Sequence, residues 1–176
     1  KTTVFNLIAG ALAPDGGSIR LRGEEIGGLS PHRICGKGVA RTFQLVRPFP
    51  GLSALDNIRV GQLYGRDPAR NDARKLLALV GLDAKPHARA ADLTLMEPKR
   101  LELARALATS PDLLLLDEFL AGLNPAETAS AMGLIQTLVA QGMTVLMVEH
   151  IVWALMKLSR RIIVLSAGEK IAEGPP

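Results

Sequence analysis

Two short apolar runs, separated by segments with helical spacing, constrain the fold of this chain more than any other feature. One is Leu113–Leu116, followed at once by Asp117 and Glu118, and the other is Thr144–Val148. Short apolar runs without alternation are typical of strands that are buried on both faces of a parallel sheet. We therefore expect an α/β fold, with a mostly parallel sheet flanked by helices.

The remaining elements follow from apolar spacing and from turn residues. Strands are expected at 18–22, 39–43, 162–166 and 171–172, and helices at 4–13, 30–35, 56–63, 71–80, 99–109, 126–141 and 151–158. The stretch from about 56 to 109 contains no expected strand. It is therefore predicted to form a helical subdomain beside the sheet, within a single domain that spans residues 1–176.

The composition agrees with one globular domain and excludes several classes of protein. A chain of 176 residues with 48% hydrophobic and 22% charged residues can bury a full core and is not intrinsically disordered. The single cysteine, Cys35, cannot form an internal disulfide, and no apolar run approaches the length that spans a bilayer. The basic residues behind the net charge of +4 are scattered and aromatic residues make up 3%, so we expect no nucleic-acid partner.

Lys1, Thr2 and Thr3 lead directly into an expected helix. A lysine followed by a hydroxyl residue ends the phosphate-binding loop G-x-x-x-x-G-K-[ST]. In that loop the lysine reaches the β- and γ-phosphates, and the hydroxyl binds Mg²⁺. Taken alone, the three residues also fit a chance lysine at a chain end.

Polar residues follow three of the expected strands, at the edge where α/β sheets bind their ligands. Asp117 and Glu118 end the first apolar run, so one carboxylate can hold Mg²⁺ while the other polarises an attacking water. His150 lies just beyond the second run and can contact a γ-phosphate. Gln44 ends an earlier strand, and its amide can reach Mg²⁺ or water. Each residue also has a purely structural interpretation, as a helix cap or a polar strand end.

The order of these residues resembles that of the ATP-binding-cassette (ABC) ATPases from end to end. In that family a Lys-Thr pair is followed by a glutamine, a motif before an Ala- and Leu-rich helix, an Asp-Glu pair and a histidine. Segments that look like the family are 5–10 (FNLIAG), 41–44 (RTFQ), 101–108 (LELARALA) and 121–125 (AGLNP). Segments 30–34, 41–44 and 121–125 are similar to the ATPase subunits of branched-chain amino acid importers.

The resemblance implies a P-loop NTPase-like nucleotide-binding domain and a role for each candidate residue. The residues implied to bind the phosphates of ATP are Lys1, Thr2 and Thr3. The residues implied to hold Mg²⁺ are Thr2, Gln44 and Asp117. For catalysis it implies Glu118 as general base, His150 at the γ-phosphate, and Gln44 as the residue that senses the membrane subunit.

The resemblance also implies partners and a location. Two ABC ATPase subunits, identical or different, sandwich two ATP molecules, and the signature motif of each subunit completes the other's site. The pair would be peripheral, at the cytoplasmic face of the inner or plasma membrane. Its partners would be transmembrane permease subunits and, indirectly, a solute-binding protein. The expected function is ATP hydrolysis that powers an importer for branched-chain or related amino acids.

The chain departs from the family at the signature. The family's Leu-Ser-Gly-Gly-Gln is matched here by residues 93–97 (LTLME), so the implied contacts with ATP fall on Thr94, Leu95 and Met96. Both glycines are lost, and the Glu97 carboxylate would repel a charge about 5 Å away by roughly 3 kcal/mol. Either Glu97 points away from the γ-phosphate, or the ATP sandwich is weak.

The second departure is at the start of the chain. Lys1 comes without the glycines of the phosphate loop and without the aromatic residue that stacks on adenine in the family. We therefore expect an N-terminally incomplete chain that binds ATP poorly as printed. Two other functions stay open: a nucleotide-binding module without turnover that serves a structural or regulatory role, and a non-transport ABC ATPase.

Overall fold

The centre of the fold is a three-stranded parallel sheet in the order β3, β4, β5. The computed structural model describes residues 1–43, 46–67, 71–94 and 96–176. The three strands are β3 (Val39–Arg41), β4 (Leu113–Asp117) and β5 (Thr144–Val148). Because β4 is hydrogen-bonded along both edges, the first apolar run of the sequence forms the middle of the sheet. The expected α/β class is confirmed.

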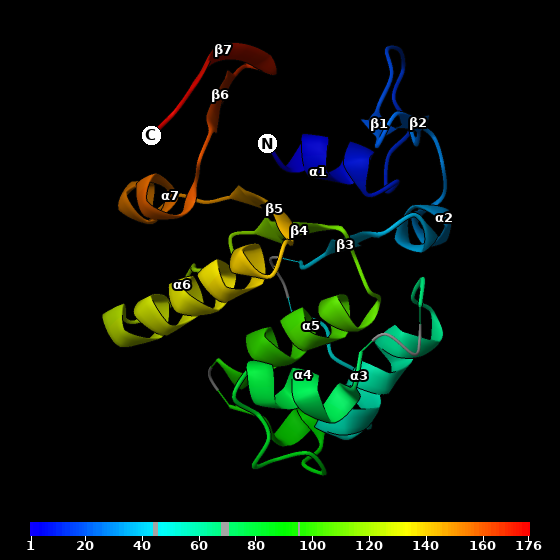
Figure 1. Cartoon of the computed structure of the whole chain (residues 1–176), viewed down its shortest axis with the longest axis vertical. Helices are drawn as coiled ribbons and strands as arrows, with labels where there is room; N and C mark the ends of the chain where they lie inside the picture. Colours follow the sequence, from blue (N-terminus) through cyan, green and yellow to red (C-terminus); the bar gives the residue numbers. More distant parts are fainter. Residues whose placement is uncertain (44–45, 68–70, 95) are drawn as a thin grey trace.

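Helices cover both faces of this sheet (Figure 1). On one face lies α1 (Thr2–Ile8), and on the other lie α3 (Ala54–Leu63), α4 (Ala73–Leu79) and α5 (Glu97–Ala108). The remaining helices are α2 (Pro31–Gly36), the short η1 (Ala90–Asp92), α6 (Pro125–Ala140) and α7 (Val152–Leu158). Two antiparallel pairs complete the fold: β1 (Arg20–Leu21) with β2 (Glu24–Glu25), and β6 (Ile162–Ser166) with β7 (Glu169–Gly174).

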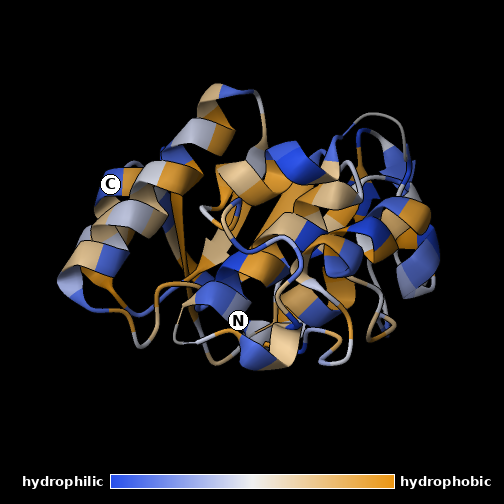
Figure 2. Cartoon of the chain, turned by 90° about the horizontal axis from the view of Figure 1, so that it is seen from below, coloured by the Kyte–Doolittle hydropathy of each residue, from blue (hydrophilic) through white to orange (hydrophobic). Residues whose placement is uncertain are grey.

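The side chains of β4 alternate between two hydrophobic clusters. Leu115 packs with Phe5 and Ile34 on the face of α1, whereas Leu114 and Leu116 belong to the larger cluster built from α3 to α6. All three leucines are fully buried, as a strand covered on both faces requires. In Figure 2 the strands in the middle are largely hydrophobic, and polar residues are spread over the surrounding helices and loops.

Several expected boundaries were wrong for local reasons. The helix expected at 4–13 ends at Ile8, because the chain turns through Gly10 at φ +74°. The strand expected at 18–22 is only β1, which pairs with β2, where no strand was expected. The turn between them has positive φ at Arg22 and Gly23, as tight hairpin turns require. The strand expected at 39–43 ends at Arg41, and the last strand is longer than expected.

The helical subdomain expected at about 56–109 stays a prediction. Its three helices, α3, α4 and α5, lie together on one side of the sheet (Figure 1). Within the described ranges, no helix combines the length and the apolar character that crossing a membrane requires.

Two glycines in helices provide a matched test of this packing. A Cβ atom at Gly61 of α3 would lie 2.4 Å from the carbonyl oxygen of Arg105 in α5, whereas one at Gly133 of α6 would meet nothing within 4 Å. We expect Gly61→Ala to lower the free energy of unfolding by about 1–3 kcal/mol, because the helices must separate. We expect Gly133→Ala to raise it by about 0.5–1 kcal/mol. Urea denaturation measures both values, and a change of the same sign in both variants would contradict the packing.

Candidate functional site

The carboxyl ends of the three parallel strands bring the predicted residues to one edge of the sheet. Arg41 ends β3, and Asp117 ends β4 with Glu118 next to it. His150 follows β5 after one intervening residue. Asp117 pairs in register with Val148, so the segments after β4 and β5 leave the sheet side by side.

A buried ion pair fixes Asp117 at this edge. Its Oδ2 atom accepts a hydrogen bond from Nη2 of Arg41 at 2.9 Å, and the two side chains are only 4% and 8% exposed. Nη1 of Arg41 donates to Oδ1 of Asn6 in α1 at 2.6 Å, and the guanidinium lies over the rings of Phe5 and Phe43. Since a buried carboxylate needs a charged partner, Arg41 makes the burial of Asp117 tolerable.

Glu118 and His150, both predicted site residues, are in direct contact. Oε1 of Glu118 lies 2.8 Å from Nε2 of His150, with side-chain exposures of 19% and 71%. The backbone of Glu118 has a positive φ of +50°, a conformation that non-glycine residues adopt rarely and at a cost in free energy. The neighbouring strand supports this turn, because the Glu118 N–H donates to the carbonyl of Val148 at 2.9 Å. The carboxylate is thus held at a rim that solvent can reach.

The residues predicted to bind phosphate lie at the start of α1. Lys1, Thr2 and Thr3 are exposed, and the carbonyl of Lys1 accepts the N–H of Val4 at 3.0 Å. Thr2 and Asp117, two of the three predicted Mg²⁺ ligands, line the same cavity. The third, Gln44, lies outside the described residues.

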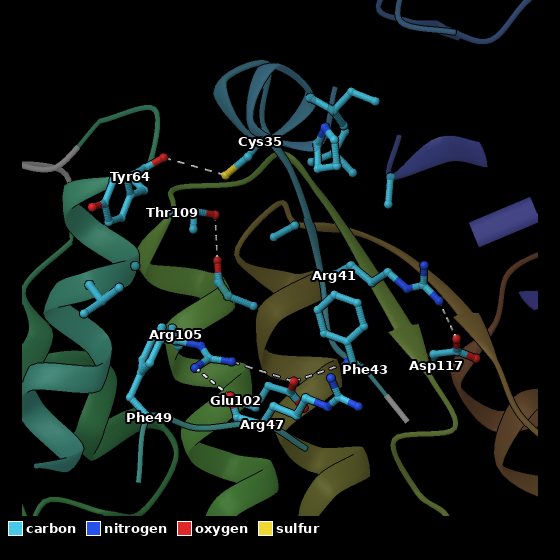
Figure 3. Close-up of a pocket in the computed structure, with 18 of the residues that line it drawn as sticks. Cys35, Arg41, Phe43, Arg47, Phe49, Tyr64, Glu102, Arg105, Thr109 and Asp117 are labelled. Carbon is cyan, nitrogen blue, oxygen red and sulfur yellow. Dashed lines mark hydrogen bonds and ion pairs between the residues drawn. The ribbon is translucent and has the colours of Figure 1, made fainter. Parts of the chain in front are cut away.

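That cavity, of about 800 Å³, extends from the sheet edge to α3 and α5 (Figure 3). It contains a charged residue that the sequence analysis missed, Glu102 of α5. Oε1 of Glu102 accepts the Phe43 N–H at 3.4 Å and lies 3.9 Å from the Arg105 guanidinium, which also stacks on Phe49. Burial raises the pKa of Glu102 to about 7. Its position between Leu101 and Leu103 in the helix expected at 99–109 indicates burial but not the groups that it contacts.

The segment matched to the signature precedes α5, and in it Glu97 binds neighbours on its own chain. Its Oε1 atom pairs with Nζ of Lys85 at 2.6 Å, and its Oε2 atom accepts the N–H of Thr94 at 3.1 Å. The hydrogen bond from the Lys85 ammonium and, to a smaller extent, the one from the Thr94 N–H lower the pKa of Glu97. Met96 occupies the N-cap position of α5 without a side-chain hydrogen bond to the helix, and Leu95 lies outside the described residues. Glu97 was expected either to point away from the γ-phosphate or to weaken the ATP sandwich. Its contacts with Lys85 and Thr94 favour the first alternative.

Comparison with known proteins identifies the family. Residues 1–121 match the family described as ABC transporter. The chain belongs to the ABC transporter family. The ABC resemblance expected from the residue order is therefore confirmed.

Curated ABC proteins match the whole chain. It is 39% identical to the high-affinity branched-chain amino acid transport ATP-binding protein BraF of Pseudomonas aeruginosa and 36% identical to LivG of Escherichia coli, which has the same description. Each match covers 100% of this chain and 76% of the relative.

Solved ABC structures have the same fold. An ATP-binding cassette of an ABC transporter superimposes with a TM-score of 0.88 at 27% identity, over 99% of this chain and 76% of that one. A cassette described in its ADP conformation gives 0.86 at 26% identity, over 100% and 76%.

Glu102 gives this ABC chain a stability that depends on pH. Since the folded state raises the pKa of this carboxyl from 4.5 to about 7, folding binds a proton between these values, and stability falls as the pH rises through that window. At pH 8 we expect Glu102→Gln to be more stable than the wild type by up to about 3 kcal/mol, and at pH 5 by much less. Denaturation at both pH values tests this, with the exposed Glu169→Gln as control. An equal difference at pH 5 and pH 8 would contradict the prediction.

Proposed function

We propose that this chain is the ATP-binding and ATP-hydrolysing subunit that powers an ABC importer for branched-chain or related amino acids. The observation that carries the proposal is the contact between Glu118 and His150, directly beside the buried Asp117 at the carboxyl edge of the sheet. BraF and LivG are both named for branched-chain amino acid transport, and this supports the class of solute.

The residues that line the cavity include oxygen donors of the kind that bind Mg²⁺. The Thr2 hydroxyl and the Asp117 carboxylate border one cavity, and oxygen donors of this kind are the ligands that Mg²⁺ prefers. When bound, Mg²⁺ would neutralise charge on the phosphates. Lys1 and Thr3, at the start of the same helix, would bind phosphate oxygens, and Gln44 would complete the metal site and respond to the membrane subunit.

In the hydrolytic step, Glu118 takes a proton from the water that attacks the γ-phosphate. The bond between the γ-phosphorus and the bridging oxygen breaks, which gives ADP and inorganic phosphate. His150, which is largely exposed, holds the Glu118 carboxylate through the 2.8 Å contact and would also contact the γ-phosphate when ATP is bound. The fixed position of the base avoids reorganisation at the moment of reaction.

We propose partners that fit this role. A second ABC subunit, identical or different, would present its signature segment, the counterpart of Thr94–Met96 in this chain, to the ATP of this one. The pair would lie at the cytoplasmic face of the membrane on transmembrane permease subunits, with a solute-binding protein acting indirectly. In this proposal the segment from about 56 to 109 is the helical subdomain that carries the Thr94–Met96 segment.

Phosphate release from Mg-ATP tests the proposed reaction in the full-length gene product. We expect Glu118→Gln to lower turnover by roughly 10²–10⁴-fold, because general base catalysis is lost, while ATP binding is retained. Asp83→Asn, an exposed carboxylate after α4, is the matched control and should leave turnover unchanged. A wild type that binds ATP without releasing phosphate would contradict hydrolysis and favour the regulatory alternative.

The contact between Lys85 and Glu97 gives a second prediction. If Lys85 offsets the charge of Glu97 near the partner's ATP, Lys85→Met should lower turnover roughly tenfold, since an unpaired carboxylate then faces phosphate. In a Glu97→Gln background the same lysine substitution should have little effect. This double-mutant cycle measures the coupling of the two residues, and equal losses in both backgrounds would contradict the role of Lys85.

A further inference from the structure

Two charged side chains from distant elements hold the backbone directly after Glu118. Nζ of Lys99, in the first turn of α5, donates to the carbonyl oxygens of Phe119, at 3.3 Å, and of Ala121. Oε1 of Glu149, just after β5, accepts the N–H of Leu120 at 2.7 Å. Three consecutive residues of the turn are therefore held through their main chain, and none of these contacts depends on the identity of the turn's own side chains.

The contacts with Phe119 and Leu120 are shielded from solvent, whereas the contact with Ala121 lies at the surface. Phe119, Leu120 and Glu149 are buried, and Lys99 is half-buried. A hydrogen bond in such surroundings is stronger than one in water, and its loss leaves a polar group unpaired. The opposite charges of Lys99 and Glu149 also attract each other across the turn.

A strained residue needs such support. Glu118 begins the turn at φ +50°, and a non-glycine residue keeps a positive φ only when its surroundings fix the backbone. The Ala121 N–H donates to the carbonyl of Glu118 at 3.1 Å, so the segment held by Lys99 and Glu149 closes directly onto Glu118. A shift of this turn would move the Glu118 carboxylate away from His150.

We propose that Lys99 and Glu149 are positioning residues that hold the turn 119–121 and thereby aim the Glu118 carboxylate at His150. The catalytic meaning of this role rests on the proposed function, in which Glu118 is the general base. The structural part of the proposal is that the Glu118–His150 contact depends on Lys99 and Glu149, and this part does not rest on the proposed function.

Substitutions that either remove or keep the hydrogen-bonding group of Lys99 and of Glu149 test this positioning role. Lys99→Met keeps the length of the side chain and removes the donor, whereas Lys99→Arg keeps a donor. Glu149→Leu removes the acceptor for the Leu120 N–H, whereas Glu149→Gln keeps an acceptor oxygen. Lys75→Met, at an exposed lysine of α4, controls for the loss of a positive charge.

Kinetics and imidazole NMR of the full-length gene product give two separate measurements. We expect Lys99→Met and Glu149→Leu to lower kcat roughly tenfold, with the KM for ATP changed by less than about twofold, because a misplaced base loses transition-state contacts but not binding. Lys99→Arg and Glu149→Gln should recover most of kcat. Lys75→Met should match the wild type.

The NMR signal of His150 reports the geometry without turnover. Its position in Glu118→Ala, which removes both carboxylate oxygens, marks the broken pair. We expect Lys99→Met and Glu149→Leu to move the signal toward that position. A His150 signal and kcat that both stay at wild-type values would overturn the proposal, as would a Lys99→Arg variant as impaired as Lys99→Met. A wild type without turnover would contradict the proposed function alone, because the His150 signal still tests the positioning role.

Discussion

The buried ion pair between Arg41 and Asp117 joins the parts of the chain from which the site is built. It links the ends of β3 and β4, and through Asn6 it reaches α1. Removing one partner would leave an uncompensated charge in the interior, which typically costs about 3–5 kcal/mol. Glu118 is the next residue after Asp117. The Arg41–Asp117 ion pair therefore also fixes the position of the proposed general base, Glu118, at the end of β4.

Much of this arrangement could be predicted from the sequence, because it depends on local patterns. An unbroken leucine run implies a strand in the middle of a parallel sheet, and parallel strands bring their carboxyl ends to one edge. The positions of Asp117, Glu118 and His150 at this edge could therefore be predicted from the sequence. The roles of Arg41, Glu102 and Glu149 could not be predicted, since a buried charge is tolerated only through partners that the fold brings from elsewhere, such as the main chain of Leu120.

The partner of Glu97, in the segment matched to the signature, could not be predicted from the sequence either. Sequence reasoning identified a repulsion between Glu97 and phosphate, but it could not identify the cation that offsets it. Lys85 precedes Glu97 by a loop and the short helix η1, and only the path of that segment brings the two side chains to 2.6 Å. The charge at the start of α5 is therefore set by Glu97 and Lys85 together. The loss of the two signature glycines affects the backbone of this segment and does not change this charge balance.

We propose that the edge formed by Asp117, Glu118 and His150 acts on an ATP that two subunits share. Light scattering of the full-length Glu118→Gln protein, with and without Mg-ATP, tests this claim most directly, because hydrolysis is blocked and the closed state accumulates. We expect the mass to double with Mg-ATP and to return to that of the monomer when the nucleotide is removed. A protein that binds ATP and remains a monomer at every concentration, alone and with its partner ATPase subunit, would contradict it.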